Sequence, residues 1–488
     1  MSNSIVEIIK NHANLTPQKR AVVDAKAEYT YSQYYDKIKA YALYLKDNGI
    51  VKGDNVLIKT AQNVQYMAAL HAIHHIGAVA VPVEKTVKDE RVNEIQSVVC
   101  AKAYIADKEF EGIDTFLYKD LPESDERELD YLPKATDDST ILFTTGTTGK
   151  SKGILLSHYA DVAVAGNVVG GTEQTDKTVE IVPMPLNHSF SLRRYYANMV
   201  SGATTIFLDG VIFVKKFFDC FDVLGATACA MAPSALAIIF KLSGEKIAEY
   251  TDKIEYLQFG GSYMPEGDKE KIRTLLPNAR LYNFYGSTEA GCSCIIDFNK
   301  NRENPYNIGK ATVNSIIKFV DENDNEVTPD VNSPARLITG GGMVMNEYYK
   351  EPELTAETLR DGYIYSNDMG YFDNDGNIIM LGRMDDVIIS GGQKISPLDV
   401  EEVANKYEGI SECAVIGVDD AVMGQIPKIF VVAKENYDEG EFMSFLSSRL
   451  EAHQVPKALS LISEIPKTFN GKPLKRELKR IHEEGGNK

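Results

Sequence analysis

The stretch Thr144-Thr145-Gly146-Thr147-Thr148-Gly149-Lys150-Ser151-Lys152-Gly153 decides how this chain is interpreted. It follows the apolar run Ile141-Leu142-Phe143, which predicts a buried strand leading into a polar loop. Glycines let backbone N–H groups approach phosphate oxygens, hydroxyls add hydrogen-bond donors, and lysines add positive charge. The stretch therefore predicts a phosphate-binding loop at the end of a strand.

The end of this loop, Gly149-Lys150-Ser151, matches the end of a Walker P-loop. The full Walker pattern needs a glycine five residues before Gly149, and Thr144 occupies that position. The spacing therefore disfavours a kinase-like or GTPase-like protein. Taken alone, a loop of this composition is also compatible with a flexible linker.

The bulk composition describes a globular chain with an acidic surface. Its 488 residues predict two to four domains, and 44% hydrophobic with 25% charged residues is ordinary for a globular protein. The formal net charge of −18 argues against binding to nucleic acid or to an anionic membrane, since both favour a basic face. An anionic small molecule remains possible, because a small positive pocket can lie within an acidic body.

The cysteines and the N-terminus indicate a cytoplasmic protein. Only Cys292 and Cys294 are close in sequence, and one intervening residue is too few for the usual zinc knuckle, so we expect reduced, buried thiols. The first residues lack a signal-peptide pattern, and no apolar run approaches the ~20 residues of a membrane span. The cysteines are Cys100, Cys220, Cys229, Cys292, Cys294 and Cys413.

The first half of the chain predicts an α/β architecture. Ser4 and Glu7 form a capping-box pattern ahead of an apolar helix that Thr16-Pro17 would end. Short apolar runs at residues 56–58 and 78–81 predict buried strands, and residues 32–45 predict a helix. Alternation of this kind favours largely parallel sheets.

The second half predicts two smaller units. Residues 314–320 and 335–339 read as strands of a β-rich subdomain, separated by turn residues such as Asp324-Asn325. Beyond Asp385 a strand at 387–389, a Gly391-Gly392 turn and a helix starting near Ser396-Pro397 change the pattern. Phe442, Phe445, Leu446 and Leu450 have helical spacing. We therefore expect an N-terminal domain over residues 1–384 and a C-terminal domain over residues 385–488.

Four further motifs follow the opening stretch in chain order. They are Asn283-Phe284-Tyr285-Gly286-Ser287-Thr288-Glu289, Tyr365-Ser366-Asn367-Asp368, Gly382-Arg383-Met384-Asp385-Asp386 with Gly391-Gly392-Gln393-Lys394-Ile395, and Pro466-Lys467-Thr468-Phe469-Asn470-Gly471-Lys472. Together with the opening stretch, they resemble the adenylate-forming superfamily of AMP-dependent synthetases and ligases, which includes acyl-CoA synthetases, adenylation domains and luciferases. The resemblance covers nearly the whole chain.

The resemblance implies a fold and a set of site residues. It implies a large N-terminal domain that binds ATP and the acyl substrate, and a small mobile α+β C-terminal domain that carries the catalytic lysine. It assigns catalysis to Lys472, His188, Thr288 and Glu289, with Glu289 also binding Mg²⁺ and Asp385 acting as the hinge. It assigns nucleotide binding to Thr144, Thr145, Gly146, Thr147, Thr148, Lys152, Gly260, Gly261, Ser262, Asn283, Phe284, Tyr285, Gly286, Asp368, Arg383 and Lys472.

One motif departs from the family pattern. The family usually has Tyr-x-Thr-Gly-Asp at the ribose-binding position, whereas this chain has Ser366-Asn367 before Asp368. The departure leaves a ribose role for Asp368 plausible and puts the local turn geometry in doubt.

The activity that the resemblance implies is the ATP-dependent activation of a small-molecule carboxylic acid, followed by thioester formation. The thiol belongs to coenzyme A or to the phosphopantetheine of a separate acyl carrier protein. A luciferase-like oxygenase uses the same first step, and a non-catalytic nucleotide-binding protein could keep the fold. Intact Lys472, Glu289 and Asp368 argue against the last alternative.

The segment from Pro185 to Arg194 matches the acyl pocket of the family. Amino-acid-activating relatives carry an Asp in this region, and Ser189-Phe190-Ser191 stand here instead, so an acyl or aryl acid is favoured over an α-amino acid. Arg193 or Arg194 could pair with a second carboxylate of the substrate. The alternative is a surface arginine or an internal ion pair.

Overall fold

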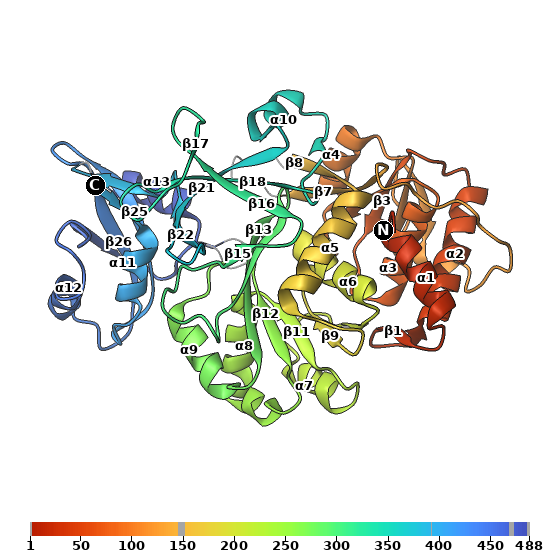
Figure 1. The fold of residues 1–488 in the computed structure, drawn as a ribbon, viewed down its shortest axis with the longest axis horizontal. Coiled ribbons are helices and arrows are strands. Elements are labelled where there is room, and N and C mark those ends of the chain that lie inside the picture. Colours follow the sequence, from red (N-terminus) through yellow and green to blue (C-terminus); the bar gives the residue numbers. More distant parts are fainter. Residues whose placement is uncertain (1, 145–151, 392, 468–472, 486–488) are drawn as a thin grey trace.

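The computed structural model describes residues 2–144, 152–391, 393–467 and 473–485. Two large, mostly parallel sheets share a layer of helices between them, and two smaller β-rich units follow in the chain (Figure 1). The α/β class and the order of units expected from the sequence are thus confirmed.

The first large sheet provides the strand ends at which most of the candidate site lies. Its central strands are parallel, and an antiparallel strand flanks the parallel set on each side. In pairing order it contains β15 (Lys310–Ala311), β14 (Gly291–Asp297), β13 (Arg280–Ser287), β12 (Tyr256–Phe259), β11 (Ala228–Met231), β9 (Val179–Val182), β10 (Thr204–Phe207), β1 (Arg20–Val23) and β2 (Glu28–Thr30).

The second large sheet carries both ends of the predicted phosphate loop. In pairing order it contains β19 (Glu347–Tyr348), β8 (Lys152–Ser157), β7 (Asp138–Thr144), β4 (Val79–Val83), β3 (Asn55–Lys59), β5 (Ala103–Ala106) and β6 (Asp114–Leu117). The pairs β7–β8 and β8–β19 are antiparallel. Thr144 therefore pairs with Lys152, which brings the two ends of the loop together.

Helices fill the space between the sheets and cover their outer faces. One buried core joins Val56 and Ala80 of the second sheet to Val182 and Phe207 of the first. The helices of this shared layer are α1 (Ile5–Leu15), α2 (Tyr31–Asp47), α3 (Val64–His75), α5 (His158–Thr172) and α6 (Ser189–Ser201). The outer faces are covered by α4 (Asp89–Val99), α7 (Val214–Asp222), α8 (Pro233–Ser243) and α9 (Glu266–Leu275).

The helix starts follow the capping chemistry of the sequence. The Ser4 hydroxyl accepts from the Glu7 amide at 3.2 Å, as the Ser4–Glu7 pattern predicts. Thr30 and Gln33 form a complete capping box at the start of α2. Each such N-cap stabilises its helix by about 1 kcal/mol, because it satisfies an otherwise unpaired backbone donor.

The β-rich subdomain is a six-stranded sheet, and the sequence predicts two of its strands, those at residues 314–320 and 335–339. The turn at Asp324-Asn325 leads from β16 into the short strand β17 and not directly into β18, and Asp324 adopts a left-handed φ of +61°. A two-residue strand lacks the length for a recognisable alternating pattern. The strands are β17 (Glu326–Val327), β16 (Ser315–Val320), β18 (Ala335–Gly341), β21 (Tyr363–Phe372), β20 (Leu359–Arg360) and β22 (Ile378–Arg383), and α10 (Pro352–Thr358) precedes β20.

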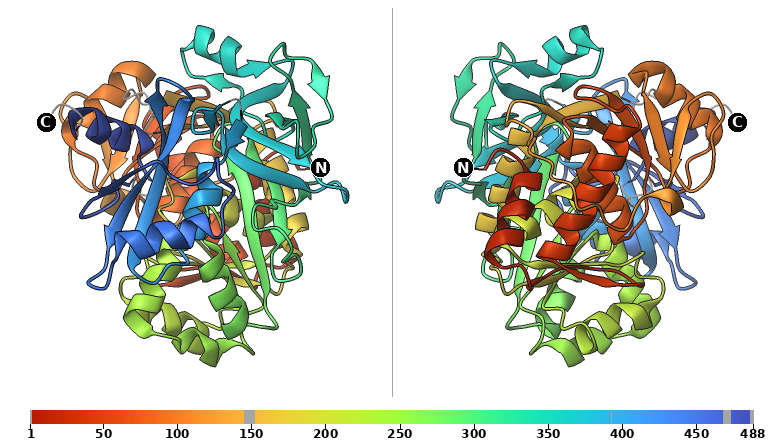
Figure 2. Two further views of the ribbon diagram at one scale, coloured as in Figure 1. Left: turned by 90° about the vertical axis from the view of Figure 1, so that its left-hand side faces the viewer. Right: turned by 90° about the vertical axis from the view of Figure 1, so that its right-hand side faces the viewer.

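The C-terminal unit lies at the end of the molecule opposite to α1 and α2, and Figure 2 shows these two ends in turn. Asp385 lies between β22 and β23, where we expect the domain boundary. Helix α12 ends at Ser447, so Leu450 packs on the core from beyond the helix. The elements are β23 (Ile388–Ser390), β24 (Gln393–Ile395), α11 (Pro397–Ala404), β25 (Ile410–Asp420), β26 (Gly424–Ala433), α12 (Glu439–Ser447), β27 (Ala458–Leu461) and α13 (Lys475–Gly485).

In the described ranges, no helix is long and apolar enough to cross a membrane. The cysteines are free thiols, and all of them except Cys100 are buried, so the expectation of buried thiols is wrong for Cys100 alone.

Candidate active site

The candidate site lies where strands of the first sheet end. Gly260, Gly261 and Ser262 follow β12, and the Asn283–Gly286 motif occupies the last half of the neighbouring strand β13. In open α/β sheets, ligands bind beyond the carboxyl ends of the strands. The fold thus brings together two motifs that are separated in sequence by helix α9.

Close backbone packing explains two of the predicted glycines. A Cβ on Gly260 would lie 1.7 Å from Cε1 of Phe284, because the Phe284 ring packs directly over this residue. A Cβ on Gly286 would lie 1.9 Å from the Gly291 carbonyl oxygen. The Phe190 ring completes this wall, with its centroid 4.6 Å from that of Phe284. Any side chain at either glycine would displace the wall.

The turn after β13 carries Thr288 and Glu289, and side chains from other elements hold both residues. The hydroxyls of Ser189 and Thr288 are 3.1 Å apart. The Tyr348 hydroxyl donates to Glu289 Oε1 at 2.8 Å. The Lys152 Nζ lies 5.3 Å from the centroid of the same Tyr348 ring. Tyr348 thus links the predicted phosphate-loop lysine to the predicted magnesium ligand.

The donor set around Glu289 suits magnesium bound together with a nucleotide. Among the described residues, no group of three or more His, Cys, Asp or Glu side chains is arranged to hold a metal alone. Mg²⁺ commonly uses one or two carboxylates, with phosphate oxygens and waters completing its octahedron. The single Glu289 carboxylate and the Thr288 hydroxyl are hard oxygen donors of this kind. Within the described part of the chain, the buried Asn283 Oδ1 also lacks a hydrogen-bond partner, which fits a nearby polar ligand group.

Asp368 faces the same site from the β-rich subdomain. The Tyr285 hydroxyl donates to Asp368 Oδ2 at 2.5 Å, so two predicted nucleotide residues from different sheets meet directly. Asp368 also pairs in register with Arg383 across β21 and β22. Arg383 is partly exposed and lies 3.9 Å from the Asp385 carboxylate. Predicted ribose-binding and hinge residues therefore lie side by side.

The departure at Ser366-Asn367 is accommodated by side-chain hydrogen bonds. The Asp368 amide donates to the Ser366 hydroxyl at 3.1 Å, and this hydroxyl donates to the Leu337 carbonyl at 2.7 Å. Arg336 Nε donates to the Ser366 carbonyl at 2.6 Å. The pairing of β18 with β21 is irregular across this segment, and these hydrogen bonds hold it in the conformation that directs Asp368 at Tyr285.

His188 is the N-cap of α6 and is partly buried. Burial lowers the pKa of its imidazole, and the nearby Glu84 charge opposes this shift. A neutral imidazole can accept or donate one hydrogen bond without adding charge to the site.

Several predicted residues cannot be placed. Thr144 ends β7 and Lys152 begins β8, but the residues between them are outside the described ranges, as is Lys472 of the predicted catalytic loop. The predicted residues concerned are Thr145, Gly146, Thr147, Thr148 and Lys472.

The two arginines of α6 do not reach toward a substrate. Arg194 is buried and pairs with the buried Glu180 at 2.6 Å, which makes it the internal ion pair of the alternative interpretation. Arg193 donates from Nη1 to the Ser287 carbonyl at 2.7 Å and from Nη2 to the Thr288 carbonyl at 2.8 Å. Both arginines are engaged within the protein, which favours the alternative of an internal role over binding of a second substrate carboxylate.

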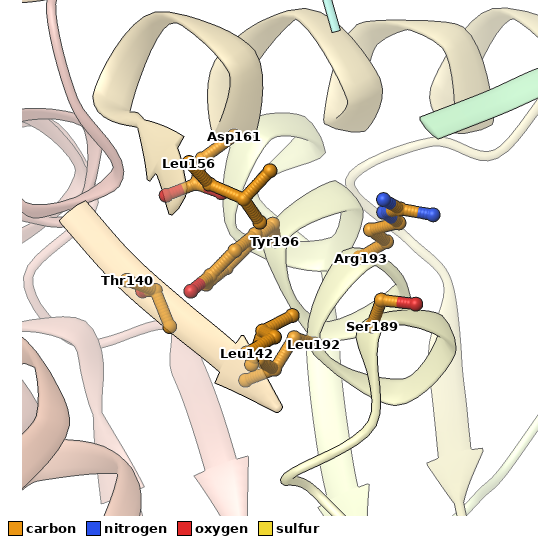
Figure 3. A pocket seen from close by; sticks show the side chains of 8 residues that line it. All are labelled: Thr140, Leu142, Leu156, Asp161, Ser189, Leu192, Arg193 and Tyr196. Atoms are coloured by element: carbon orange, nitrogen blue, oxygen red, sulfur yellow. The ribbon is translucent and has the colours of Figure 1, made fainter. Parts of the chain in front are cut away.

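A small polar cavity lies behind Arg193. Figure 3 shows Arg193 and Ser189 directed to one side of it, away from Asp161 and Tyr196. Burial raises the pKa of the Asp161 carboxyl to about 7, and hydrogen bonding to Ser139 and the charge of Arg193 oppose this shift. The residues that line the cavity are Thr140, Leu142, Leu156, Asp161, Ser189, Leu192, Arg193 and Tyr196.

Sequence reasoning missed Tyr348 and the role of Ser189. Tyr348 reaches the site because β19 pairs with β8, about 190 residues earlier in the chain. A two-residue strand has no periodicity that could reveal such a pairing. From the sequence, Ser189 is only one of three residues that stand in place of an Asp.

Known protein families and curated relatives match nearly the whole length of the chain. Residues 9–349 match the family model described as AMP-binding enzyme, and residues 399–472 match the AMP-binding enzyme C-terminal domain. The 2-succinylbenzoate–CoA ligase of Bacillus thuringiensis subsp. konkukian (strain 97-27) is 26% identical over 504 aligned positions, which cover 99% of this chain and 100% of the relative.

Solved structures share the fold. ATP-bound MatB from Rhodopseudomonas palustris superposes with a TM-score of 0.88 at 22% identity, covering 99% of both chains. The O-succinylbenzoate coenzyme A synthetase (MenE) from Bacillus subtilis, in complex with ATP and magnesium ion, superposes with a TM-score of 0.85 at 22% identity, covering 97% of this chain and 99% of that chain. At this identity, the likeness concerns the fold.

Proposed function

The chain belongs to the AMP-binding enzyme family, and on this premise we propose that it activates a carboxylic acid with ATP and passes the acyl group to the thiol of coenzyme A. It is an AMP-forming acid–thiol ligase. The observation that most supports the proposal is the approach of two halves of one site, the Thr288–Glu289 turn after β13 and the Asp368–Tyr285 pair.

In the first half-reaction, an oxygen of the substrate carboxylate attacks the α-phosphorus of ATP. The bond from the α-phosphorus to the bridging oxygen breaks, and pyrophosphate leaves. Two anions must approach each other, so the work is positional and electrostatic, with little need for a general base. When bound, Mg²⁺ neutralises charge on the phosphates.

The chain's own residues hold the reacting groups. Glu289 would ligate the metal, and the Thr288 hydroxyl would donate to the α-phosphate. Asp368 and Arg383 would hold the ribose hydroxyls. Lys472, whose role rests on its motif alone, would bridge the carboxylate and the α-phosphate.

In the second half-reaction, the thiol attacks the acyl carbon and AMP leaves. His188 would lie between the acyl pocket and the thiol path, where burial favours its neutral imidazole. The C-terminal domain would rotate about Asp385 between the two steps and withdraw Lys472. We place the domain boundary at this residue.

For the substrate, we propose an acyl or aryl acid, with 2-succinylbenzoate as the first compound to test because relatives bear that name. Recognition of a second carboxylate would have to use groups other than Arg193 and Arg194, which are engaged internally. The free thiols suit a reducing compartment, and we propose a cytoplasmic location.

The test is pyrophosphate release across a panel of carboxylic acids, with and without coenzyme A. We expect acid-dependent release and AMP formation that coenzyme A accelerates. Turnover only with an added holo carrier protein would favour the carrier-loading alternative. Pyrophosphate exchange that responds to no acid would contradict the proposal.

Lys472→Ala separates the two half-reactions. It should abolish adenylation and spare thioester formation from a supplied acyl-adenylate. Equal loss of both half-reactions would contradict the assignment of Lys472.

A further inference from the structure

Arg193 is a buried cation that binds backbone and not a carboxylate. It is 6% exposed, and burial lowers the pKa of its guanidinium. Among the described residues, no carboxylate oxygen lies within 4.0 Å of it, whereas Arg194 beside it has Glu180. Charged side chains are seldom buried unless they are paired. The cost of burying Arg193 therefore calls for a specific reason.

The reason is visible at the end of the side chain. Its two terminal nitrogens donate to consecutive carbonyls, those of Ser287 and Thr288, at 2.7 and 2.8 Å. A planar guanidinium that binds two successive carbonyls fixes the orientation of the peptide between them. That peptide links Ser287 to Thr288, and Glu289 follows at once.

Other contacts complete the support of this turn. The Glu289 carbonyl accepts from the Met345 amide at 2.8 Å, so the three carbonyls of residues 287–289 all have donors. Ser189, one helical turn before Arg193, contacts the Thr288 hydroxyl. The side-chain hydroxyl of Thr288 and the carboxylate of Glu289 are thus held before any ligand arrives.

We propose that Arg193 is a positioning residue for the magnesium–nucleotide site, which fixes Thr288 and Glu289 in the orientation that receives MgATP. This inference rests on the proposed function for the identity of the ligand. Arg193 acts through the turn and does not itself touch the substrate.

The experiment measures MgATP binding by calorimetry, without any acid, in wild type, Arg193→Met, Arg193→Lys and Ser189→Ala. Arg193→Met should weaken ATP binding and raise the half-saturating Mg²⁺ concentration about tenfold, because two charge-assisted hydrogen bonds are lost. Arg193→Lys should recover part of this loss, because lysine keeps the positive charge. The recovery is partial because a single ammonium group does not reproduce the planar fork that binds both carbonyls. Ser189→Ala should give a smaller change in the same direction.

Arg20→Met is the matched control. Arg20 Nη2 donates to the Leu224 carbonyl at 2.7 Å and Nη1 lies 3.7 Å from Glu28, so this variant loses an arginine–carbonyl bond and an ion pair to an exposed carboxylate without touching residues 287–289. It should bind MgATP like wild type. The same comparison in turnover should show a raised KM for ATP in Arg193→Met, with the KM for the acid and thioester formation from supplied acyl-adenylate unchanged.

Wild-type Mg²⁺ dependence in a folded Arg193→Met protein would overturn the inference. Equal weakening of MgATP binding in Arg20→Met would also overturn it, as would equal losses in every kinetic constant of Arg193→Met. Either result would indicate a general effect on folding. If Arg193→Met does not fold, Arg193→Lys and Ser189→Ala carry the same comparison. Failure of the proposed function is distinct, because it would appear as MgATP binding without turnover of any acid.

Discussion

The Thr288–Glu289 turn and the edge that carries Asp368 and Arg383 face one candidate site, but they are held in different ways. The turn is supported by α6 and β19 through buried side chains, and its backbone carbonyls are all engaged. The other edge is a hairpin whose charged residues reach solvent: the side chains of Arg383 and Asp385 are 41% and 67% exposed.

The difference corresponds to what each half must do. A metal and phosphate site gains from donors fixed in advance, because no reorganisation is then needed during the reaction. The proposed rotation about Asp385 would need an edge that can move, and buried polar contacts would resist it. We therefore expect changes in the buried half to be costly and changes at the exposed edge to be mild.

The largest effect should come from the buried ion pair of α6, the helix that also carries Arg193. Arg194→Met would leave Glu180 buried without its partner, and losing one member of a buried pair costs about 3–5 kcal/mol. Urea unfolding measures this loss. If the double variant Arg194→Met with Glu180→Leu regains stability, the uncompensated Glu180 charge is the cause of the loss. A loss below about 1 kcal/mol in Arg194→Met alone would contradict the prediction.

The next effect is a loss of stability in acid. Burial lowers the pKa of His158 to about 4; by smaller amounts, the Asp137 charge opposes this shift and the Lys52 charge adds to it. An unfolded histidine titrates near 6.5, so the unfolded chain binds a proton between pH 6.5 and 4 that the folded chain does not. Stability should therefore fall as pH drops through this window, by about 3 kcal/mol for this residue.

Unfolding of wild type and His158→Gln from pH 7.5 to 4 checks the contribution. The difference between the two should shrink as the pH falls. His453→Gln is the control, because its imidazole is partly exposed beside Glu451. Parallel pH curves for wild type and His158→Gln would show that His158 does not supply the dependence.

A smaller effect should appear at Glu289, the proposed metal ligand. Tyr348→Phe removes the donor to Glu289, and a hydrogen bond to a charged group contributes a net ~1.5–3 kcal/mol, of which water can restore part because Glu289 is only partly buried. We expect a several-fold rise in half-saturating Mg²⁺. The neighbouring Tyr349→Phe is the control, because the Tyr349 hydroxyl accepts from Asn55 instead. Equal Mg²⁺ curves for both variants would contradict a role for Tyr348.

The smallest effect is expected at the exposed edge. Asp385→Asn removes a 3.9 Å ion pair between exposed side chains, and such pairs contribute at most about 1 kcal/mol. Thermal unfolding should barely change. A loss comparable to that of Arg194→Met would remove the distinction between the two halves.

Much of the fold follows from local patterns in the chain. Helix α1 begins at the Ser4 cap that predicts it, α2 contains the predicted helix at 32–45, and strands β3, β4 and β7 occupy the apolar runs. Short strands such as β17 and β19 escaped prediction, because two residues cannot display a period. Their positions depend on pairing with segments far away in the chain.

The candidate site likewise has features that the sequence predicts and features that only the fold establishes. The sequence by itself determined the family resemblance and the residue types available for phosphate, ribose and metal, since motif spacing preserves that chemistry. Only the tertiary structure decided which of them meet: Tyr285 with Asp368, Tyr348 with Glu289, and Arg193 with the backbone at 287–288. Arg193 and Arg194 are identical neighbours in the sequence. Their directions from α6 differ by about 100°, so one meets a buried carboxylate and the other meets the turn.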